Sequence, residues 1–295
     1  SLEEFRGRWK TVHGWEIMDG KREILDHDSG PLWVIAGPGS GKTEALIIKT
    51  LKLLIVEGVD PESVMLTTFT EKGAEELQDR IANAVEDFGY GDEIDISTLR
   101  TGTLHSLCDE IMREYRYSEY IDLELLDGED QEFFIKRHSD AVDWIKSDSD
   151  VYEYFRPVMD RFSRQYGPNT WQATQIAVQV LNKTRQYLVD PDQLAEADQP
   201  VLRELSDNLV EYQETLDEHF RTDFAELQLH FLDFLDSEFG RSFVNGDEEL
   251  EQASLEYVLV DEYQDTNPLQ EAIYFELAEA CDNDIVVVGD DDQAL

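Results

Sequence analysis

The chain of 295 residues is longer than a typical single domain, and its 41% hydrophobic and 11% aromatic residues are enough for a sizeable core. This composition excludes an intrinsically disordered chain, although 67 Asp and Glu against 24 Lys and Arg give a formal net charge of −43. The acidic residues are spread along the whole chain, which favours a surface adapted to a very salty, halophilic cytoplasm over an ordinary acidic protein.

Four short runs of apolar and β-branched residues predict β-strands, and their near-continuous hydrophobicity predicts burial on both faces. In chain order the runs are 32–36, 64–69, 257–260 and 285–288. Helical patterns follow three of them, at 42–56, 72–85 and 268–280. This strand–helix alternation predicts an α/β fold, with a parallel sheet covered by helices.

The middle of the chain has helical patterns and no convincing strand. Examples of these patterns are 130–146, 172–187 and 201–216. The strand-bearing domain is therefore predicted to be split by an all-helical insertion. We expect the first part of the domain at 1–109, the insertion at 110–218 and the second part of the domain at 219–295.

The two cysteines, Cys108 and Cys281, lie far apart and have no metal-ligand spacing with the six histidines. This pattern predicts a reducing cytoplasm and no structural metal. The most apolar stretch, 46–56, is broken by Lys49 and Lys52, and no export leader opens the chain. We therefore expect a cytoplasmic protein without a membrane span.

The strongest local signal follows the first predicted strand and opens a helix, which is the context that a phosphate-binding loop requires. Its residues are Ala36, Gly37, Pro38, Gly39, Ser40, Gly41, Lys42 and Thr43. The glycines let backbone N–H groups converge on phosphates, and the helix N-terminus adds positive potential. Lys42 is expected to reach the β- and γ-phosphates of ATP, and Thr43 to ligate Mg²⁺. The alternative is a glycine-rich turn that binds no nucleotide.

A second signal, the segment 261–267 that begins with Asp261 and Glu262, directly follows the predicted strand 257–260. Carboxylates at the carboxyl end of a parallel strand lie where ligands bind in open sheets. Asp261 is expected to hold Mg²⁺, and Glu262 to orient or deprotonate the attacking water. Because acidic residues are frequent throughout this chain, the pair gains its weight from its position after the strand and from the residues that follow it, 263–267.

Together these residues resemble the UvrD/Rep type of superfamily-one DNA helicase. Four further segments match that family in order: an early DNA-contacting motif, a threonine–histidine motif, the segment after the helical insertion, and the motif that couples the γ-phosphate to DNA. They are 68–72, 102–106, 223–227 and 288–293. For the fold, the resemblance implies a RecA-like P-loop NTPase sheet with an inserted all-helical subdomain.

The resemblance also implies roles for individual residues. Phe69 is expected to stack on a base of single-stranded DNA, although a core aromatic at a strand end is the alternative. Gln293 is implied to sense the γ-phosphate, beside the catalytic roles of Lys42 and Glu262. The DNA-contacting residues that the resemblance implies are Thr68, Phe69, Thr70, Lys72, Thr103 and His105.

Two residues near the expected adenine depart from the family's pattern. Lys21 stands where the family usually places a glutamine that reads adenine, and Glu44 stands where some relatives carry a cationic residue. Because a lysine only donates hydrogen bonds, we expect discrimination between ATP and GTP to be modest, under about tenfold.

The function that the resemblance implies is a motor that couples Mg²⁺-ATP hydrolysis to movement on single-stranded DNA and to duplex unwinding. It implies a second RecA-like domain of the full-length protein as partner, so the chain to Leu295 alone is expected to bind nucleotide with little turnover. Two alternatives stay open: the motor of a recombination helicase–nuclease subunit, and a non-catalytic, nucleotide-responsive DNA-binding module.

Overall fold

The computed structural model describes residues 1–14, 16–37, 39–138, 149–162, 170–247 and 252–290. The chain divides into two compact units. The sheet unit consists of Ser1–Tyr117, Phe231–Thr266 and Gln270–Leu295, and the helical unit of Ser118–His230 with Asn267–Leu269.

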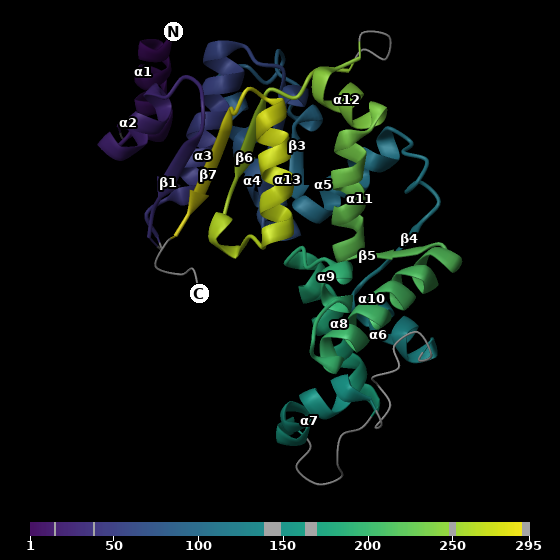
Figure 1. Ribbon diagram of the computed structural model, residues 1–295. Helices are drawn as coiled ribbons and strands as arrows, with labels where there is room; N and C mark the ends of the chain where they lie inside the picture. The colour runs from purple at the N-terminus through teal and green to yellow at the C-terminus, as the bar shows by residue number, and fades with distance from the viewer. Residues whose placement is uncertain (15, 38, 139–148, 163–169, 248–251, 291–295) are drawn as a thin grey trace. The chain divides into compact units, whose positions relative to one another are not determined.

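A five-stranded sheet in the order β1-β7-β6-β2-β3 forms the centre of the sheet unit (Figure 1). Every pairing between neighbouring strands is parallel, so the predicted α/β fold with a parallel sheet is confirmed. The late strands β7 and β6 lie between β1 and β2, so both parts of the unit share one sheet. The strands are β1 (Leu32–Ile35), β2 (Val64–Thr68), β3 (Arg100–Thr103), β6 (Tyr257–Val260) and β7 (Ile285–Gly289).

Helices cover both faces of this sheet. The connections α3 (Lys42–Leu51) and α4 (Glu71–Asp87) pack together on one face, and α13 (Pro268–Ala280) crosses the other (Figure 1). Right-handed crossovers require this arrangement, because the chain moves one way along the sheet through α3 and α4 and returns through α13. The unit's other helices are α1 (Leu2–His13), α2 (Asp19–Asp26), the π-helical segment Lys52–Glu57, α5 (Leu104–Glu114), α12 (Glu238–Asn245) and the end of α11 (Phe224–Asp236).

The core on the α3 and α4 face is made of aliphatic side chains that are at most 2% exposed. They include Leu46, Ile48, Leu66, Leu77, Ile81, Leu259 and Val286. Burial of such side chains, worth about 1.5–3 kcal/mol each, holds the strand ends in fixed positions. The residues that follow those ends are therefore placed by the sheet.

β1 differs from the prediction that every strand is buried on both faces. Trp33 and Ile35 are 64% and 55% exposed, and they alternate with the half-buried Leu32 and Val34. Successive side chains of a strand point to opposite faces, so one face of β1 is left open among the described residues. β1 is also an edge strand of the described sheet, paired to β7 alone.

The helical unit contains five complete helices and the first part of α11 among its described residues, together with one short two-stranded parallel sheet. Here the expectation of a middle without strands is wrong, because β4 pairs with β5 in parallel. Three residues per strand are too few to give a period-2 pattern in the sequence. The elements are β4 (Glu124–Leu126), α6 (Gly128–Arg137), α7 (Asp150–Phe162), α8 (Thr170–Gln186), α9 (Pro191–Ala195), α10 (Pro200–Glu218) and β5 (Arg221–Asp223).

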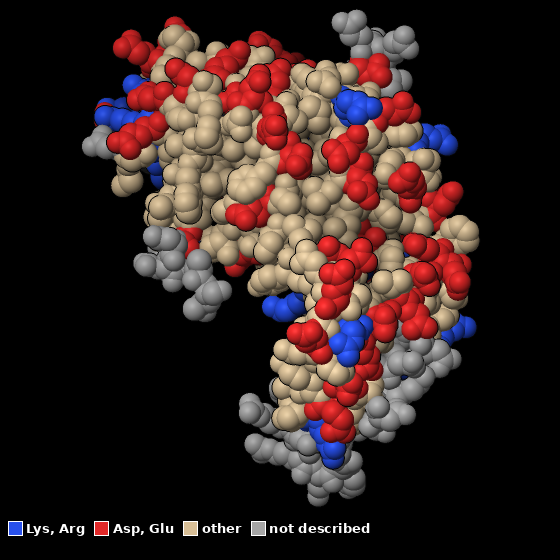
Figure 2. Space-filling model, viewed as in Figure 1, with Lys and Arg blue, Asp and Glu red and all other residues tan. Residues whose placement is uncertain are grey.

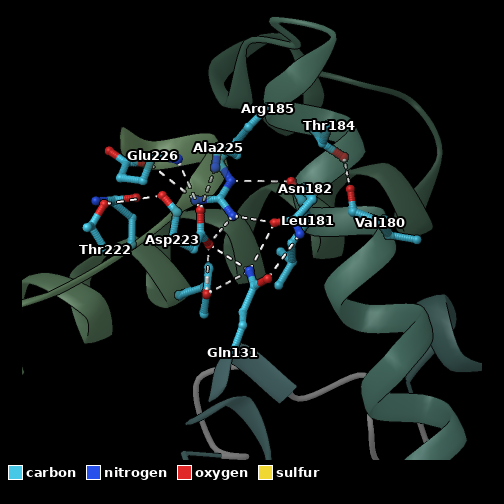
Figure 3. Close-up of polar contacts among 12 residues, drawn as sticks. Gln131, Val180, Leu181, Asn182, Thr184, Arg185, Thr222, Asp223, Ala225 and Glu226 are labelled. Carbon is cyan, nitrogen blue, oxygen red and sulfur yellow. Dashed lines mark hydrogen bonds and ion pairs between the residues drawn. The ribbon is translucent and has the colours of Figure 1, made fainter. Parts of the chain in front are cut away.

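A buried polar network ties α6, α8 and α10 to the start of α11 (Figure 3). Arg185 donates to Oδ2 of Asp223 at 2.5 Å, and its other terminal nitrogen lies 3.3 Å from Glu226. Gln131 and Tyr212 donate to the same Oδ2 at 2.7 and 2.9 Å. The second oxygen of Asp223 accepts two backbone N–H bonds in the first turn of α11, each 3.0 Å long. Asp223 is therefore a helix cap and the centre of the network at once.

Both cysteines, Cys108 and Cys281, are buried and form no disulfide. Burial raises the pKa of the Cys281 thiol to about 12 and holds the pKa of Cys108 well above its usual range. Both thiols are therefore protonated and poorly reactive. Among the helices that the structure describes, none is long and apolar enough to cross a membrane.

Acidic side chains are scattered over the visible surface, whereas basic side chains are sparse (Figure 2). With a formal net charge of −43, repulsion between carboxylates opposes the compact state unless salt screens it. We expect the thermal unfolding midpoint to rise steadily from dilute buffer to multi-molar KCl, as followed by circular dichroism. A midpoint that stays flat or falls as KCl increases contradicts adaptation to high salt.

Candidate functional site

The predicted phosphate-binding loop connects β1 to α3, as its sequence indicates. Gly39 and Gly41 have φ values of 74° and 83°, a left-handed conformation that favours glycine. Gly41 is the N-cap of α3, and Ser40 Oγ donates to the carbonyl of Gly37 at 2.6 Å. The N–H groups of the first turn of α3 therefore open toward the loop, as anion binding requires. Pro38 lies outside the described residues.

The loop and the acidic segment after β6 meet, although they are more than 200 residues apart in the chain. Lys42 Nζ donates to Oε2 of Glu262 at 2.7 Å, and Thr43 Oγ1 donates to Oδ2 of Asp261 at 3.1 Å. Parallel strands bring their carboxyl ends to one edge of the sheet, and this shared edge produces the two contacts.

The two carboxylates of the acidic segment have opposite pKa shifts. Burial raises the pKa of Asp261, and the neighbouring charge of Glu262 adds to the effect. Burial also acts to raise the pKa of Glu262, but hydrogen bonds from Lys42 and Gln264 outweigh it and lower that pKa. Glu262 is therefore ionised at neutral pH, as an acceptor of a proton must be.

Gln264, within the acidic segment 261–267, also belongs to this site, although no role was predicted for it from the sequence. Its Nε2 donates to Oε2 of Glu262 at 2.6 Å, and its Oε1 accepts from the backbone N–H of Asp290 at 2.9 Å. It thereby links the acidic segment to the end of β7. Glu262 itself has a φ of 53° and a ψ of 42°, a left-handed conformation uncommon outside glycine. Gln293, the expected γ-phosphate sensor, lies outside the described residues.

A cavity of about 410 Å³ opens beside these contacts. It is lined by Thr43, Asp261 and Glu262 on one side and by one face of α4 on the other. The residues of α4 that line it are Gly73, Glu76, Leu77 and Arg80. Arg80 was not predicted as a site residue from the sequence. It lies three and four residues after Leu77 and Glu76, a spacing that places the three on one helical face.

Phe69 also lines this cavity and is 62% exposed, so the alternative of a core aromatic is wrong. It also lines a second cavity of about 140 Å³, together with Thr68, Thr103 and His105. Asp261 and Glu262, the expected metal ligand and base, line both cavities, as Phe69 does.

The other residues expected to contact DNA have structural partners. Thr103 caps α5, is only 9% exposed and donates to Oε1 of Glu71 at 2.7 Å. Thr70 caps α4, and the exposed Lys72 lies 3.3 Å from Glu76. Burial lowers the pKa of the half-buried His105, which favours a neutral imidazole at pH 7.

Lys21 lies on the opposite side of the phosphate loop, in α2, and forms an ion pair with Glu44 in the first turn of α3. Lys21, Ser40, Gly41 and Lys42 all line a further cavity of about 460 Å³. Lys21 and Glu44, the two residues that depart from the family's pattern, therefore contact each other. Thr43 and Asp261 line the 410 Å³ cavity and do not line this one.

Comparison with known proteins gives a consistent match over nearly the whole chain. The family model described as UvrD/REP helicase N-terminal domain matches residues 18–295. The chain is 28% identical over 283 residues to DNA helicase II of Escherichia coli (strain K12), which covers 95% of this chain and 34% of that protein. It is 29% identical over 281 residues to the ATP-dependent DNA helicase PcrA of Bacillus subtilis (strain 168), which covers 93% and 33%. The chain spans about a third of the length of these curated relatives.

Proposed function

This chain belongs to the UvrD/REP helicase family, and from that premise we propose that it holds Mg²⁺-ATP in a motor that moves along single-stranded DNA and unwinds duplexes. The observation that carries the proposal is the meeting of Lys42 with Glu262 and of Thr43 with Asp261 at one sheet edge. A glycine-rich turn without a nucleotide would give no reason for these four side chains to converge.

The donor set fits magnesium. Thr43 Oγ1 and the Asp261 carboxylate are oxygen ligands 3.1 Å apart, and Mg²⁺ in nucleotide sites typically takes only one or two protein carboxylates plus substrate phosphates. In this assignment Thr43 and Asp261 hold the ion, and Lys42 binds the β- and γ-phosphates. Bound Mg²⁺ neutralises charge that develops on the phosphates. Glu262 orients the attacking water and accepts its proton.

We assign the DNA to the side of the sheet edge where Phe69 is exposed. An exposed aromatic ring stacks on any base, which suits a motor that must move over all sequences. Thr103 and His105 then act mainly by shaping this surface, because Thr103 is engaged with Glu71. Asp261 and Glu262, which line both cavities, give a direct route by which DNA and ATP affect one another.

The sheet unit is proposed to be the motor domain and the helical unit its insertion, with a second RecA-like domain of the full-length protein as partner. Phosphoryl transfer in such motors depends on arginines worth about 10³–10⁵ in rate. Among the described residues that contact or line the expected phosphate site, the cations are Lys42, Arg80 and Lys21, and Lys21 is already paired with Glu44. We therefore propose that the 295-residue chain alone binds nucleotide with little turnover.

Two variants, each expected to affect the binding of one ligand, test where ATP and single-stranded DNA bind. In multi-molar KCl, Lys42→Ala is expected to lose Mg²⁺-ATP binding, because no other described side chain replaces its ammonium in the loop. Phe69→Ala is expected to keep ATP binding and to weaken binding of single-stranded DNA by about 1–3 kcal/mol, the value of one stacked base. Fluorescence titrations with a labelled ATP analogue and a labelled oligonucleotide measure both constants.

Each variant is the control for the other, since both are made in the same unit. If Lys42→Ala binds ATP like the parent, the loop is a turn without nucleotide and the proposed function falls. If Phe69→Ala binds DNA like the parent, the DNA lies elsewhere on the molecule.

A further inference from the structure

A mostly apolar groove lies within the helical unit, between the end of α8, α9, α10 and the start of α11. Its volume is about 440 Å³, and all of its lining residues belong to this one unit. Three of its side chains, Leu188, Val189 and Val210, are 46%, 38% and 47% exposed. Covering such apolar surface stabilises a complex, so the groove can dock a partner. The apolar residues that line it are Leu188, Val189, Pro191, Leu209, Val210 and Leu229.

The backbone at Leu188 has a left-handed conformation, with a φ of 54°. Its N–H donates to the carbonyl of Arg185 at 2.9 Å, and the N–H of Val189 donates to the carbonyl of Thr184 at 3.0 Å. These two bonds end α8 in the motif that usually has glycine at this position, because a side chain here crowds the backbone. Leucine therefore has a conformational cost, which its half-exposed side chain recovers only in part. A partner that covers Leu188 would account for a leucine at this position.

The groove lies in an unusually acidic part of the chain. Residues 190–218, which contain α9 and α10, have ten Asp and Glu and one cation, Arg203, whereas the whole chain has 67 and 24. Within the groove, Arg185 is already paired with Asp223 and Glu226. Three exposed acidic residues lie three residues before and four and seven residues after Val210, and so share its helical face: Asp207, Glu214 and Asp217. The groove is thus apolar with an anionic border.

We propose that this groove docks a cationic amphipathic helix of a partner protein. Apolar side chains of that helix pack against Leu188 and Val210, and its Lys and Arg side chains face Glu214 and Asp217. An amphipathic helix carries both groups at the required spacing, since its apolar side chains recur every three or four residues and its charges lie beside them. The phosphates of DNA, or a second copy of this acidic chain, would meet carboxylates of like charge at the same border.

Three labelled peptides test the fit by fluorescence anisotropy with the whole chain, at the lowest KCl concentration that keeps it folded. The first is a designed helix with leucines at i, i+3, i+4 and i+7 and lysines elsewhere on its surface. The second has the same composition in scrambled order, and the third has glutamates in place of the lysines. We expect the first to bind at least about tenfold more tightly than either, because one buried apolar side chain is worth roughly that factor. Equal binding of the scrambled peptide means that net charge alone attracts it and overturns the proposal.

Val210→Asp locates the peptide on the molecule. It adds negative charge, which favours any cationic peptide, so weaker binding can only come from the lost apolar contact. We expect a loss of roughly tenfold or more. Val158→Asp is the matched control: Val158 lies in α7, is 43% exposed and does not line the groove, and this variant should bind like the parent. If the two variants bind the peptide equally, the docking site lies elsewhere.

Leu188→Gly separates docking from folding. Glycine suits the left-handed backbone, so the thermal unfolding midpoint is expected to stay the same or rise, while peptide binding falls roughly tenfold. Parent-like binding, or a lower midpoint, means that Leu188 serves the fold and contradicts the proposal. Two further results would assign the groove to another occupant. One is weaker binding of labelled single-stranded DNA by Val210→Asp than by Val158→Asp, and the other is a dimer of the parent that Val210→Asp dissociates in sedimentation equilibrium.

Discussion

Replacing Arg185 by methionine is expected to lower the unfolding free energy of the helical unit by about 3–5 kcal/mol. Methionine fills a similar volume, so the cost comes from charge and not from a cavity. The substitution leaves Asp223, which is fully buried, and Glu226, which is 9% exposed, without their cation. A buried carboxylate without a cation has no water to stabilise its charge. This unfavourable charge accounts for most of the expected loss in unfolding free energy.

Urea unfolding of the whole chain in high KCl, followed by circular dichroism, measures the loss. The matched control is Arg156→Met, whose partner Glu153 lies 3.1 Å away with both side chains 54% exposed, and we expect a cost below about 1 kcal/mol. A cost for Arg185→Met no larger than this control means that water enters the network and that the helices are held by apolar contacts alone.

The same network predicts how the loss depends on pH. Burial raises the pKa of Glu226 to about 7, well above the ordinary range of a glutamate. A carboxyl whose folded pKa is raised contributes stability below its unfolded pKa, and this contribution is lost as pH rises through the folded value. Removing Arg185 takes away an attraction that lowers this pKa, so the raised pKa rises further. The gap between parent and Arg185→Met should therefore narrow as pH falls from 8 toward 5.

Much of the sheet could be predicted from sequence because four strands are nearly continuous apolar runs. β3 was missed because its residues, Arg100–Thr103, include an arginine, two threonines and a glycine and lack that signal. Its place at the edge of the sheet allows this, since an edge strand needs less apolar surface. The helical pattern 42–56 covers an α-helix to Leu51 and then a π-helical segment from Lys52, a change of hydrogen bonding that periodicity does not report.

The candidate site, like the sheet, could be predicted from the sequence only in part. Lys42, Thr43, Asp261 and Glu262 could be found because each lies beside a strand end in a recognisable local pattern. The contacts among them could not, since they join residues 218 and 220 positions apart. Gln264 has no signal of its own, because an amide gains its role only from the two groups that it joins.

The ion pair between Lys42 and Glu262 has a consequence for the reaction. In the proposed function, bound phosphates compete for the Lys42 ammonium, which in this structure donates to Glu262. When the ammonium leaves Glu262, the carboxylate loses one of the hydrogen bonds that lower its pKa. Burial, which raises this pKa, is then opposed by fewer contacts. Under the proposed function, we therefore expect the carboxylate to become a stronger base when ATP binds, which would couple ATP binding to the activation of water.

Glu262→Gln in the full-length protein is therefore expected to reduce ATP turnover by about 10²–10⁴, the usual contribution of a positioned general base. Mg²⁺-ATP binding should persist, because Lys42, Thr43 and Asp261 are unchanged and one negative charge near the phosphates is removed. A coupled phosphate-release assay gives turnover, and a titration with a labelled ATP analogue gives affinity. Lys42→Ala, unlike Glu262→Gln, is expected to lose both ATP turnover and Mg²⁺-ATP binding.

Glu271→Gln is the matched control, because it removes a carboxylate from the same region of the fold. Glu271 accepts from the Tyr263 hydroxyl at 2.8 Å and does not line either cavity at the sheet edge. We expect its turnover to stay within a few-fold of the parent. If Glu262→Gln turns ATP over as fast as Glu271→Gln does, water is activated by another group. The pairing of Glu262 with Lys42 would then serve to order the empty loop and play no part in catalysis.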